Sequence, residues 1–271
     1  MIYAWLYTVA CALGLNIVDM INDTLPASFI LSMSCFIASI ISLIIFRNKN
    51  IHINRLVLDN FLTFVLINIT TLLVLISSYF SVVYIPVSTY LILFFSFSTI
   101  IKSKTINFSL VIIITACFLE LLNLSLHYKD GYIMTIIITF IGAIANNIFL
   151  KYSKKVSAIT NDNKIILSLR YWLTAFTMLL ITKMNLINNN LLNTHNVILI
   201  FISAILCLII PIYFSTKAVS IISTNKFILI AITTPFLAII AAIIMGNSWF
   251  LIDLICGFFL LIGNISSQNN N

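Results

Sequence analysis

Charged residues are scarce in this sequence, and their scarcity excludes most classes of protein. Asp, Glu, Lys and Arg make up 8% of the 271 residues, 62% are hydrophobic, and the mean hydropathy is +1.17. Soluble domains carry about 25% charged residues. A water-soluble core cannot conceal so much apolar surface at this chain length. The composition therefore predicts an all-α polytopic membrane protein embedded in a lipid bilayer, because apolar runs cross membranes as helices.

Motifs for metal, redox and nucleotide chemistry are also missing. The sequence contains no GxxxxGK(S/T), HExxH, GxSxG or DDxxD pattern. The five cysteines stand singly inside apolar runs, without Cys-x-x-Cys or Cys/His spacing, and we interpret them as small buried hydrophobic residues. We therefore expect no cofactor, no metal, no ATP-driven step and no enzymatic activity. The cysteines are Cys11, Cys35, Cys117, Cys207 and Cys256.

Acidic residues are few relative to basic ones. The chain has 7 Asp and Glu against 14 Lys and Arg, a formal net charge of +7. The basic residues are scattered between apolar runs rather than gathered on a soluble domain, so nucleic acid is not an expected partner. Their distribution is instead a signal of membrane topology.

The apolar runs predict ten membrane-spanning helices. The polar segments between them are short, which indicates one membrane domain without a soluble module. The predicted spans are residues 2–20, 27–46, 57–79, 87–101, 107–124, 132–150, 165–182, 197–216, 226–246 and 250–264.

Lysine and arginine are distributed unevenly between the predicted loops. With a cytoplasmic N-terminus, the inside loops carry eleven of them and the outside loops two. This bias predicts that both termini are cytoplasmic. We expect the protein in the cytoplasmic (inner) membrane. The inside residues are Arg47, Lys49, Arg55, Lys102, Lys104, Lys151, Lys154, Lys155, Lys164, Lys217 and Lys226, and the outside residues are Lys129 and Lys183.

Ten spans divide into two inverted five-helix repeats, because an odd number of spans per half reverses the second half in the membrane. Val87-Ser-Thr opens the fourth predicted span, and Ile222-Ser-Thr precedes the ninth. We expect a first repeat at 1–125, a second at 126–265 and a disordered polar tail at 266–271. Inverted repeats are a recurrent transporter architecture with the substrate site at their interface.

Several segments resemble the EamA-type carriers of the drug/metabolite transporter superfamily. The closing stretch reads Pro235-Phe-Leu-Ala-Ile-Ile-Ala-Ala-Ile-Ile-Met-Gly-Asn-Ser-Trp, followed by Ile252-Asp-Leu-Ile-Cys-Gly-Phe-Phe-Leu-Leu-Ile-Gly. Tyr79-Phe-Ser-Val-Val-Tyr-Ile-Pro-Val-Ser, Ala10-Cys-Ala-Leu-Gly-Leu-Asn and Pro26-Ala-Ser-Phe resemble earlier parts of that fold. The resemblance covers nearly the whole chain and implies a secondary transporter. Asn247 stands where the family has a turn glutamate, and the first-half mid-span proline is absent.

Two short strings also resemble the related nucleotide-sugar and triose-phosphate branch. They are Lys151-Tyr-Ser-Lys-Lys and Asn225-Lys226. That branch uses basic residues near its cavity for anionic substrates. A nucleotide-sugar or organic-anion exchanger that uses Lys226 is therefore an alternative function.

Uncharged polar residues inside the spans are the candidate substrate contacts, because polar groups in lipid need partners. In the family that this chain resembles, spans one, three, four, six, eight and nine line the cavity. Each candidate taken singly also fits a hydrogen bond between helices or an interfacial anchor. The uncharged candidates are Asn16, Asn68, Thr71, Tyr90, Asn146, Tyr213, Thr233 and Thr234, and the basic residue Lys226 completes the set.

Ionisable residues within the spans lie near span ends. Asp59, Asp253 and Arg170 are interpreted as interfacial anchors, Arg170 by extending to the cytoplasmic face. Glu120 lies deeper, and a proton-linked role and an interhelical hydrogen bond stay open for it.

These observations predict a carrier that moves a small polar or amphiphilic metabolite by alternating access. The small-molecule substrate would bind at mid-depth between the two halves. Proton coupling and a homodimer stay open. A non-transporting membrane subunit of a larger complex is the alternative from another class, since low charge and many Phe residues fit it too.

Overall fold

The computed structural model describes residues 1–46, 60–103, 107–127, 131–160, 170–182, 193–222 and 224–269. Within these ranges the chain is helical and contains no strand. The helices are α1 (Ile2–Asn22), α2 (Ala27–Phe46), α4 (Phe61–Ser81), α5 (Val87–Lys102), α6 (Phe108–His127), α7 (Tyr132–Thr160), α9 (Trp172–Ile181), α10 (Thr194–Ser203), the π-helix η3 (Ala204–Ile209), α11 (Ile210–Ile221), α12 (Thr224–Ala231), α13 (Thr234–Met245) and α14 (Leu251–Asn269).

Seven stretches of the described chain are long and apolar enough to cross a membrane, and three more apolar helices are shorter. The prediction of an all-helical polytopic membrane protein is confirmed at this level. The long stretches are Ile2–Asn22, Ala27–Ile44, Phe61–Ser81, Phe108–His127, Tyr132–Ser153, Thr194–Val219 and Lys226–Met245, and the shorter ones are Val87–Lys102, Trp172–Ile181 and Leu251–Ser267.

Some helix ends differ from the predicted span ends. Helix α7 continues to Thr160, and α14 continues to Asn269 into the range predicted as a disordered tail. Both extensions are polar, and a helix that has left an apolar layer can continue with its backbone hydrogen bonds intact. The predicted starts at 57 and 165 lie outside the described residues, as do seven of the charges used for topology: Arg47, Lys49, Arg55, Lys104, Lys129, Lys164 and Lys183.

Two of the long stretches depart from a regular α-helix, each beside a proline. Helices α10 and α11 are joined through η3, and Pro211 follows directly in the first turn of α11. Helices α12 and α13 are separated at Ile232 and Thr233, just before Pro235. Proline has no N–H to donate to the carbonyl four residues earlier and its ring clashes with that carbonyl, so the regular helix breaks or widens there.

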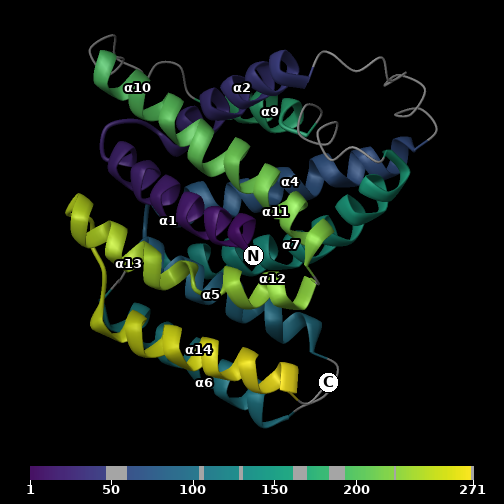
Figure 1. Ribbon diagram of the computed structural model, residues 1–271. Helices are drawn as coiled ribbons and strands as arrows, with labels where there is room; N and C mark the ends of the chain where they lie inside the picture. Colours follow the sequence, from purple (N-terminus) through teal and green to yellow (C-terminus); the bar gives the residue numbers. More distant parts are fainter. Residues whose placement is uncertain are drawn as a thin grey trace.

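The helices form one bundle with two distinct edges (Figure 1). Helices α6 and α14 pack along each other at one edge, and α2 and α9 pack together at the opposite edge. Helix α1 runs between these edges, in contact with α11 and α13. The interior between the edges therefore receives side chains from both ends of the sequence.

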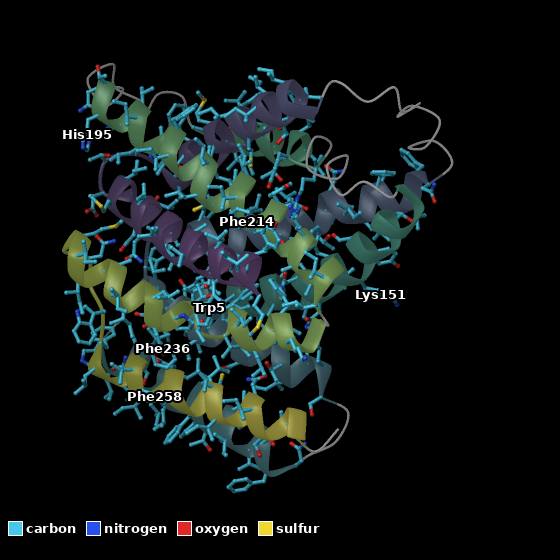
Figure 2. All side chains as sticks on the ribbon, viewed as in Figure 1. Trp5, Lys151, His195, Phe214, Phe236 and Phe258 are labelled. Carbon is cyan, nitrogen blue, oxygen red and sulfur yellow. The ribbon has the colours of Figure 1, made fainter. Side chains whose placement is uncertain are left out.

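The outer surface of the bundle is apolar, and much of the interior is polar. Large side chains such as Leu180, Leu126 and Ile244 are at least 77% exposed. Figure 2 shows the side chains over the whole bundle, with Phe236 of α13 and Phe258 of α14 meeting at a ring-centroid distance of 5.0 Å. Lipid solvates an apolar exterior, whereas hydroxyl and amide groups are satisfied inside the bundle.

Two glycines allow pairs of helices to approach closely. A Cβ added at Gly14 in α1 would lie 2.5 Å from Cys207 Sγ and 2.9 Å from the Cys207 backbone nitrogen of η3. A Cβ added at Gly142 in α7 would lie 2.3 Å from both Cβ and Oγ of Ser77 in α4. Any larger residue at either position would push the helices apart.

Candidate functional site

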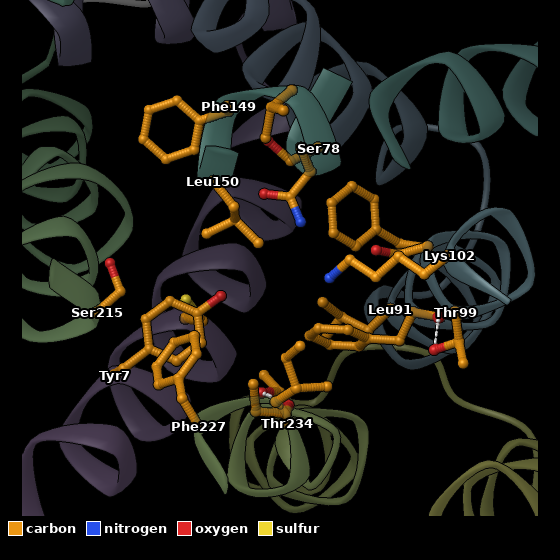
Figure 3. Close-up of a pocket in the computed structure, with 18 of the residues that line it drawn as sticks. Tyr7, Ser78, Leu91, Thr99, Lys102, Phe149, Leu150, Ser215, Phe227 and Thr234 are labelled. Carbon is orange, nitrogen blue, oxygen red and sulfur yellow. Dashed lines mark hydrogen bonds between the residues drawn. The ribbon is translucent and has the colours of Figure 1, made fainter. Parts of the chain in front are cut away.

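A cavity of about 510 Å³ lies in the interior of the bundle (Figure 3). Its wall is built from both halves of the sequence: α1, α4, α5 and α6 from the first, and α7, the π-helix with α11, α12, α13 and α14 from the second. Cavities of roughly 300–1,000 Å³ hold small molecules in proteins. The interior between the two halves is therefore hollow and large enough for a metabolite.

The interrupted helix pair α12 and α13 forms part of this wall. Thr234 is 1% exposed, lines the cavity, and donates its hydroxyl to the Ala231 carbonyl at 2.5 Å. Thr233 donates its hydroxyl to the Ile230 carbonyl at 2.7 Å. These two hydroxyls satisfy carbonyls at the break, which allows an irregular backbone at membrane depth beside a cavity.

Aromatic residues give the wall a mixed polar and apolar character. Tyr90 of α5 is 2% exposed, its hydroxyl accepts a hydrogen bond from Ser77 Oγ at 3.5 Å, and its ring lies 5.6 Å from that of Phe94. Tyr7 of α1 and Phe227 of α12 lie beside each other at the cavity, with ring centroids 5.1 Å apart (Figure 3). Such a wall suits a solute that has an apolar body and a few polar groups.

The adjacent residues Asn146 and Asn147 of α7 have different roles. Asn146 lines the cavity. Asn147 accepts from Ser98 Oγ at 2.9 Å and donates to the Ser98 carbonyl at 3.1 Å, which joins α7 to α5. Neighbouring positions on a helix point about 100° apart, so only one of the two can face the cavity directly.

Two basic residues line the cavity, and none of its lining residues in the described chain is acidic. Arg170, just before α9, is 4% exposed, with its guanidinium carbon 4.2 Å from the Phe149 ring centroid. Lys102 ends α5, and Figure 3 shows its side chain extending into the space between Leu91 and Leu150. The charge on the cavity wall is thus positive.

The structure places three of the nine candidate residues on the cavity wall: Tyr90, Asn146 and Thr234. The other six lie elsewhere. Asn68 and Thr71 donate to carbonyls of their own helix at 2.9 and 2.7 Å. Lys226 is exposed at the start of α12, outside the cavity lining, so its position does not favour the exchanger alternative based on it. Tyr213 and Thr233 also lie off the wall.

Asn16, the remaining candidate, joins helices instead of lining the cavity. It is 0% exposed and donates from Nδ2 to the Ala12 carbonyl at 2.9 Å and the Ala238 carbonyl at 3.2 Å. Asn247 donates from Nδ2 to the Asn16 carbonyl at 2.8 Å. Asn247 stands where the family that this chain resembles has a glutamate in the turn. Its hydrogen bond joins the end of α13 to α1.

Arg170 is the main cavity-lining residue that sequence reasoning misjudged. We expected it to extend to the cytoplasmic face, but the structure buries it in the cavity wall, where its guanidinium lies over the Phe149 ring of α7 and near the Tyr171 ring. It was the only arginine inside a predicted span, and this feature could have identified it as a candidate site residue. Lys102 was counted only as a loop charge, and no sequence pattern distinguished it from other span-end lysines.

Two buried carboxylates lie outside the cavity. Asp253 of α14 is 0% exposed and accepts from the hydroxyls of Ser88 and, at 2.9 Å, Thr89 in the first turn of α5. It therefore joins two helices near a helix N-terminus, where negative charge is favourable, and is not an interfacial anchor. Glu120 of α6 is also 0% exposed, and neither of its carboxylate oxygens has a hydrogen-bond partner within the described chain.

No protein-family profile matches this chain, and no curated protein sequence matches it.

Proposed function

We propose that the protein is a secondary carrier that moves a small polar or amphiphilic metabolite across the cytoplasmic membrane by alternating access. The observation that carries this proposal is the cavity of about 510 Å³ between the two halves of the sequence, bordered by the interrupted α12–α13 stretch and by the π-helix η3. Interrupted helices beside a central site are a recurrent feature of secondary transporters. The sequence resemblance to EamA-type carriers agrees with this function.

The pairing of helices supports ten spans arranged as two inverted five-helix repeats. In that arrangement, α1, α2, α4, α5 and α6 correspond to α7, α9, the α10–η3–α11 stretch, the α12–α13 stretch and α14. Helix α4 packs on α7 as α11 packs on α1, and α5 packs on α7 as α13 packs on α1. Helix α5 packs on α6 as α13 packs on α14. Helix α2 packs on η3 as α9 packs on α4. Each of these contacts thus has a counterpart under the correspondence of the two halves.

Residue-level contacts repeat in the same way. Gly14 of α1 approaches Cys207 of η3, and Gly142 of α7 approaches Ser77 of α4, so each first helix of a repeat meets the third helix of the other through a glycine. The side-chain amides of α1 and α7 also make equivalent contacts: Asn16 donates to the Ala238 carbonyl at 3.2 Å, and Asn147 donates to the Ser98 carbonyl at 3.1 Å. Equivalent interfaces of this kind would let the two halves rock about the site.

The cavity extends toward the side that the Lys and Arg bias assigns to the cytoplasm. Its wall includes Ser103 and Asn107 between α5 and α6, and Ser267 near the end of α14. At the other side, Ser81 Oγ and Thr139 Oγ1 lie 3.1 Å apart and join α4 to α7. We infer an inward-facing state, with both termini cytoplasmic and the outer side closed by this contact and by Asn16 with Asn247.

A transport assay tests this function. Purified protein in liposomes would be screened for uptake of a metabolite panel, with and without a pH gradient. The dependence of uptake on the pH gradient would differ between coupling to protons, exchange of substrates and movement down the substrate gradient. For any compound transported, Asn146→Leu should lower uptake about 10-fold through loss of a polar contact. Asn68→Leu, which alters the same residue type outside the cavity lining, should not. Uptake of no compound, or equal loss in both variants, would contradict the proposal.

A further inference from the structure

The charge of the cavity wall indicates what kind of solute it accepts, if the protein is the carrier proposed above. The wall contains Arg170 and Lys102, and none of its lining residues in the described chain is Asp or Glu. A buried cation without a nearby anion is costly, because burial removes its hydration and nothing replaces it. Arginine cannot avoid this cost by losing its proton in a protein.

Arg170 retains donors that no residue in the described part of the chain accepts from. Its side chain is 4% exposed, and its Nε and Nη1 atoms have no hydrogen-bond partner within the described residues. The Phe149 ring, 4.2 Å from the guanidinium carbon, contacts the face of the group. A ring stacked on the face of the guanidinium stabilises its charge but accepts no hydrogen bond from the N–H groups at its edge. Donors of this charged kind suit a carboxylate or a phosphate, whose oxygens accept charge-assisted hydrogen bonds.

Other groups on the wall extend this donor set. The Tyr79 hydroxyl is buried and lacks a partner among the described residues. Lys102 is exposed at the cavity and extends into it (Figure 3). Leu91 and Leu150 supply apolar surface beside it. The cavity thus combines a buried cation, a more hydrated cation and apolar walls, as an organic anion requires.

We propose that this cavity binds a small organic anion, whose carboxylate or phosphate group is taken by Arg170 with Lys102 as a second cation. This assignment deepens the proposed function by naming the substrate class. A phosphate group could also belong to the headgroup of an anionic lipid, and the test must separate that source from a soluble solute.

Binding measured by calorimetry, in nanodiscs of neutral phosphatidylcholine, tests the proposal. Inorganic phosphate and succinate are the anionic probes, and succinamide is the uncharged match of succinate. Phosphate or succinate should bind and succinamide should not. Arg170→Gln should weaken binding about 10-fold or more, because it removes charge-assisted hydrogen bonds in a buried site. Lys102→Gln should weaken it less, up to about fivefold, because Lys102 is exposed.

Two controls keep the test decisive. Lys151→Gln removes an exposed lysine on α7 outside the cavity lining and should leave binding unchanged. If Arg170→Gln fails to fold, Lys102→Gln and Arg170→Lys, which retains the charge, carry the test. Equal binding of succinamide and succinate, or an equal loss with Lys151→Gln, would overturn the anion site.

The same binding measurement in nanodiscs that contain phosphatidylglycerol tests whether the bound anion is a lipid headgroup. If soluble anions fail to bind in neutral nanodiscs, and an Arg170-dependent interaction requires phosphatidylglycerol, the occupant is a headgroup and the substrate assignment is wrong. Failure of the carrier function would give a different result from failure of the anion site. Arg170-dependent succinate binding without transport of any anion in liposomes would support the anion site and contradict transport. Transport of only neutral or cationic compounds would retain the carrier and reject the anion class.

Discussion

Replacing Gly14 with alanine should destabilise the protein through a clash with backbone that cannot move independently. The new Cβ would lie 2.5 Å from Cys207 Sγ, 2.9 Å from the Cys207 nitrogen and 3.0 Å from the Leu206 carbonyl carbon. Carbon contacts are optimal at about 3.5–4.0 Å, so the helices must separate by roughly 0.5–1 Å. Overpacking of this kind costs about 1–3 kcal/mol. Helix propensity returns about 1 kcal/mol, so we expect a net loss of up to about 2 kcal/mol.

Unfolding by SDS in mixed micelles, followed by tryptophan fluorescence, measures this loss. Gly257→Ala is the matched control, because its Cβ would meet only the Phe236 ring, whose nearest atom is 3.0 Å away and can turn aside. Removing the sulfur in Gly14→Ala/Cys207→Ala should restore stability only in part, since the two backbone contacts remain. Because Gly257→Ala gains the same helix propensity, a Gly14→Ala variant as stable as Gly257→Ala would refute the close contact between α1 and η3.

Two further substitutions test other contacts. Gly142→Ala should destabilise the protein by a similar net amount of up to about 2 kcal/mol. Because both contacts at 2.3 Å are with the Ser77 side chain, Ser77→Gly should rescue the variant, and failure of that rescue would count against the α4–α7 contact. Asp253→Ala should cost about 1.5–3 kcal/mol by leaving the hydroxyls of Ser88 and Thr89 without their charged acceptor, and Asp253→Asn should cost less. The same SDS unfolding measures both, and an unchanged Asp253→Ala variant would show that the α14–α5 bonds are not formed.

The helical fold was largely predictable, because long apolar runs in a weakly charged chain have few alternatives to spanning helices. The proline-associated interruptions were foreseeable in part: Pro235 and Pro211 mark both of them, but a π-helix before Pro211 depends on how α1 packs against that stretch. The extension of α14 to Asn269 was not foreseeable, because its polar sequence is equally compatible with a disordered tail.

The candidate site was less predictable than the fold. Asn16, Asn68, Asn146 and Asn147 are the same residue type inside apolar spans, yet only Asn146 lines the cavity. Which face of a helix meets the cavity is set by packing among distant segments, and local sequence carries little of that information. Arg170 differs, because a buried arginine must be enclosed by groups from several helices, and the contact with Phe149 comes from another part of the chain.

The most direct test of alternating access is the sidedness of thiol labelling at the cavity. Cys11 and Cys207 line it, whereas Cys35, Cys117 and Cys256 do not. In oriented liposomes, a membrane-impermeant maleimide should label Cys11 and Cys207 from the cytoplasmic side and, as the carrier cycles, from the outer side.

The measurement becomes decisive when the outer side is locked. Ser81 Oγ and Thr139 Oγ1 lie 3.1 Å apart, so a Ser81→Cys/Thr139→Cys variant places two sulfurs within bridging distance. Oxidation should abolish labelling of Cys11 and Cys207 from the outer side, leave labelling from the cytoplasmic side intact, and be reversed by reductant. Labelling from the outer side that persists after the bridge forms, or that never occurs in the reduced protein, would contradict alternating access through this cavity.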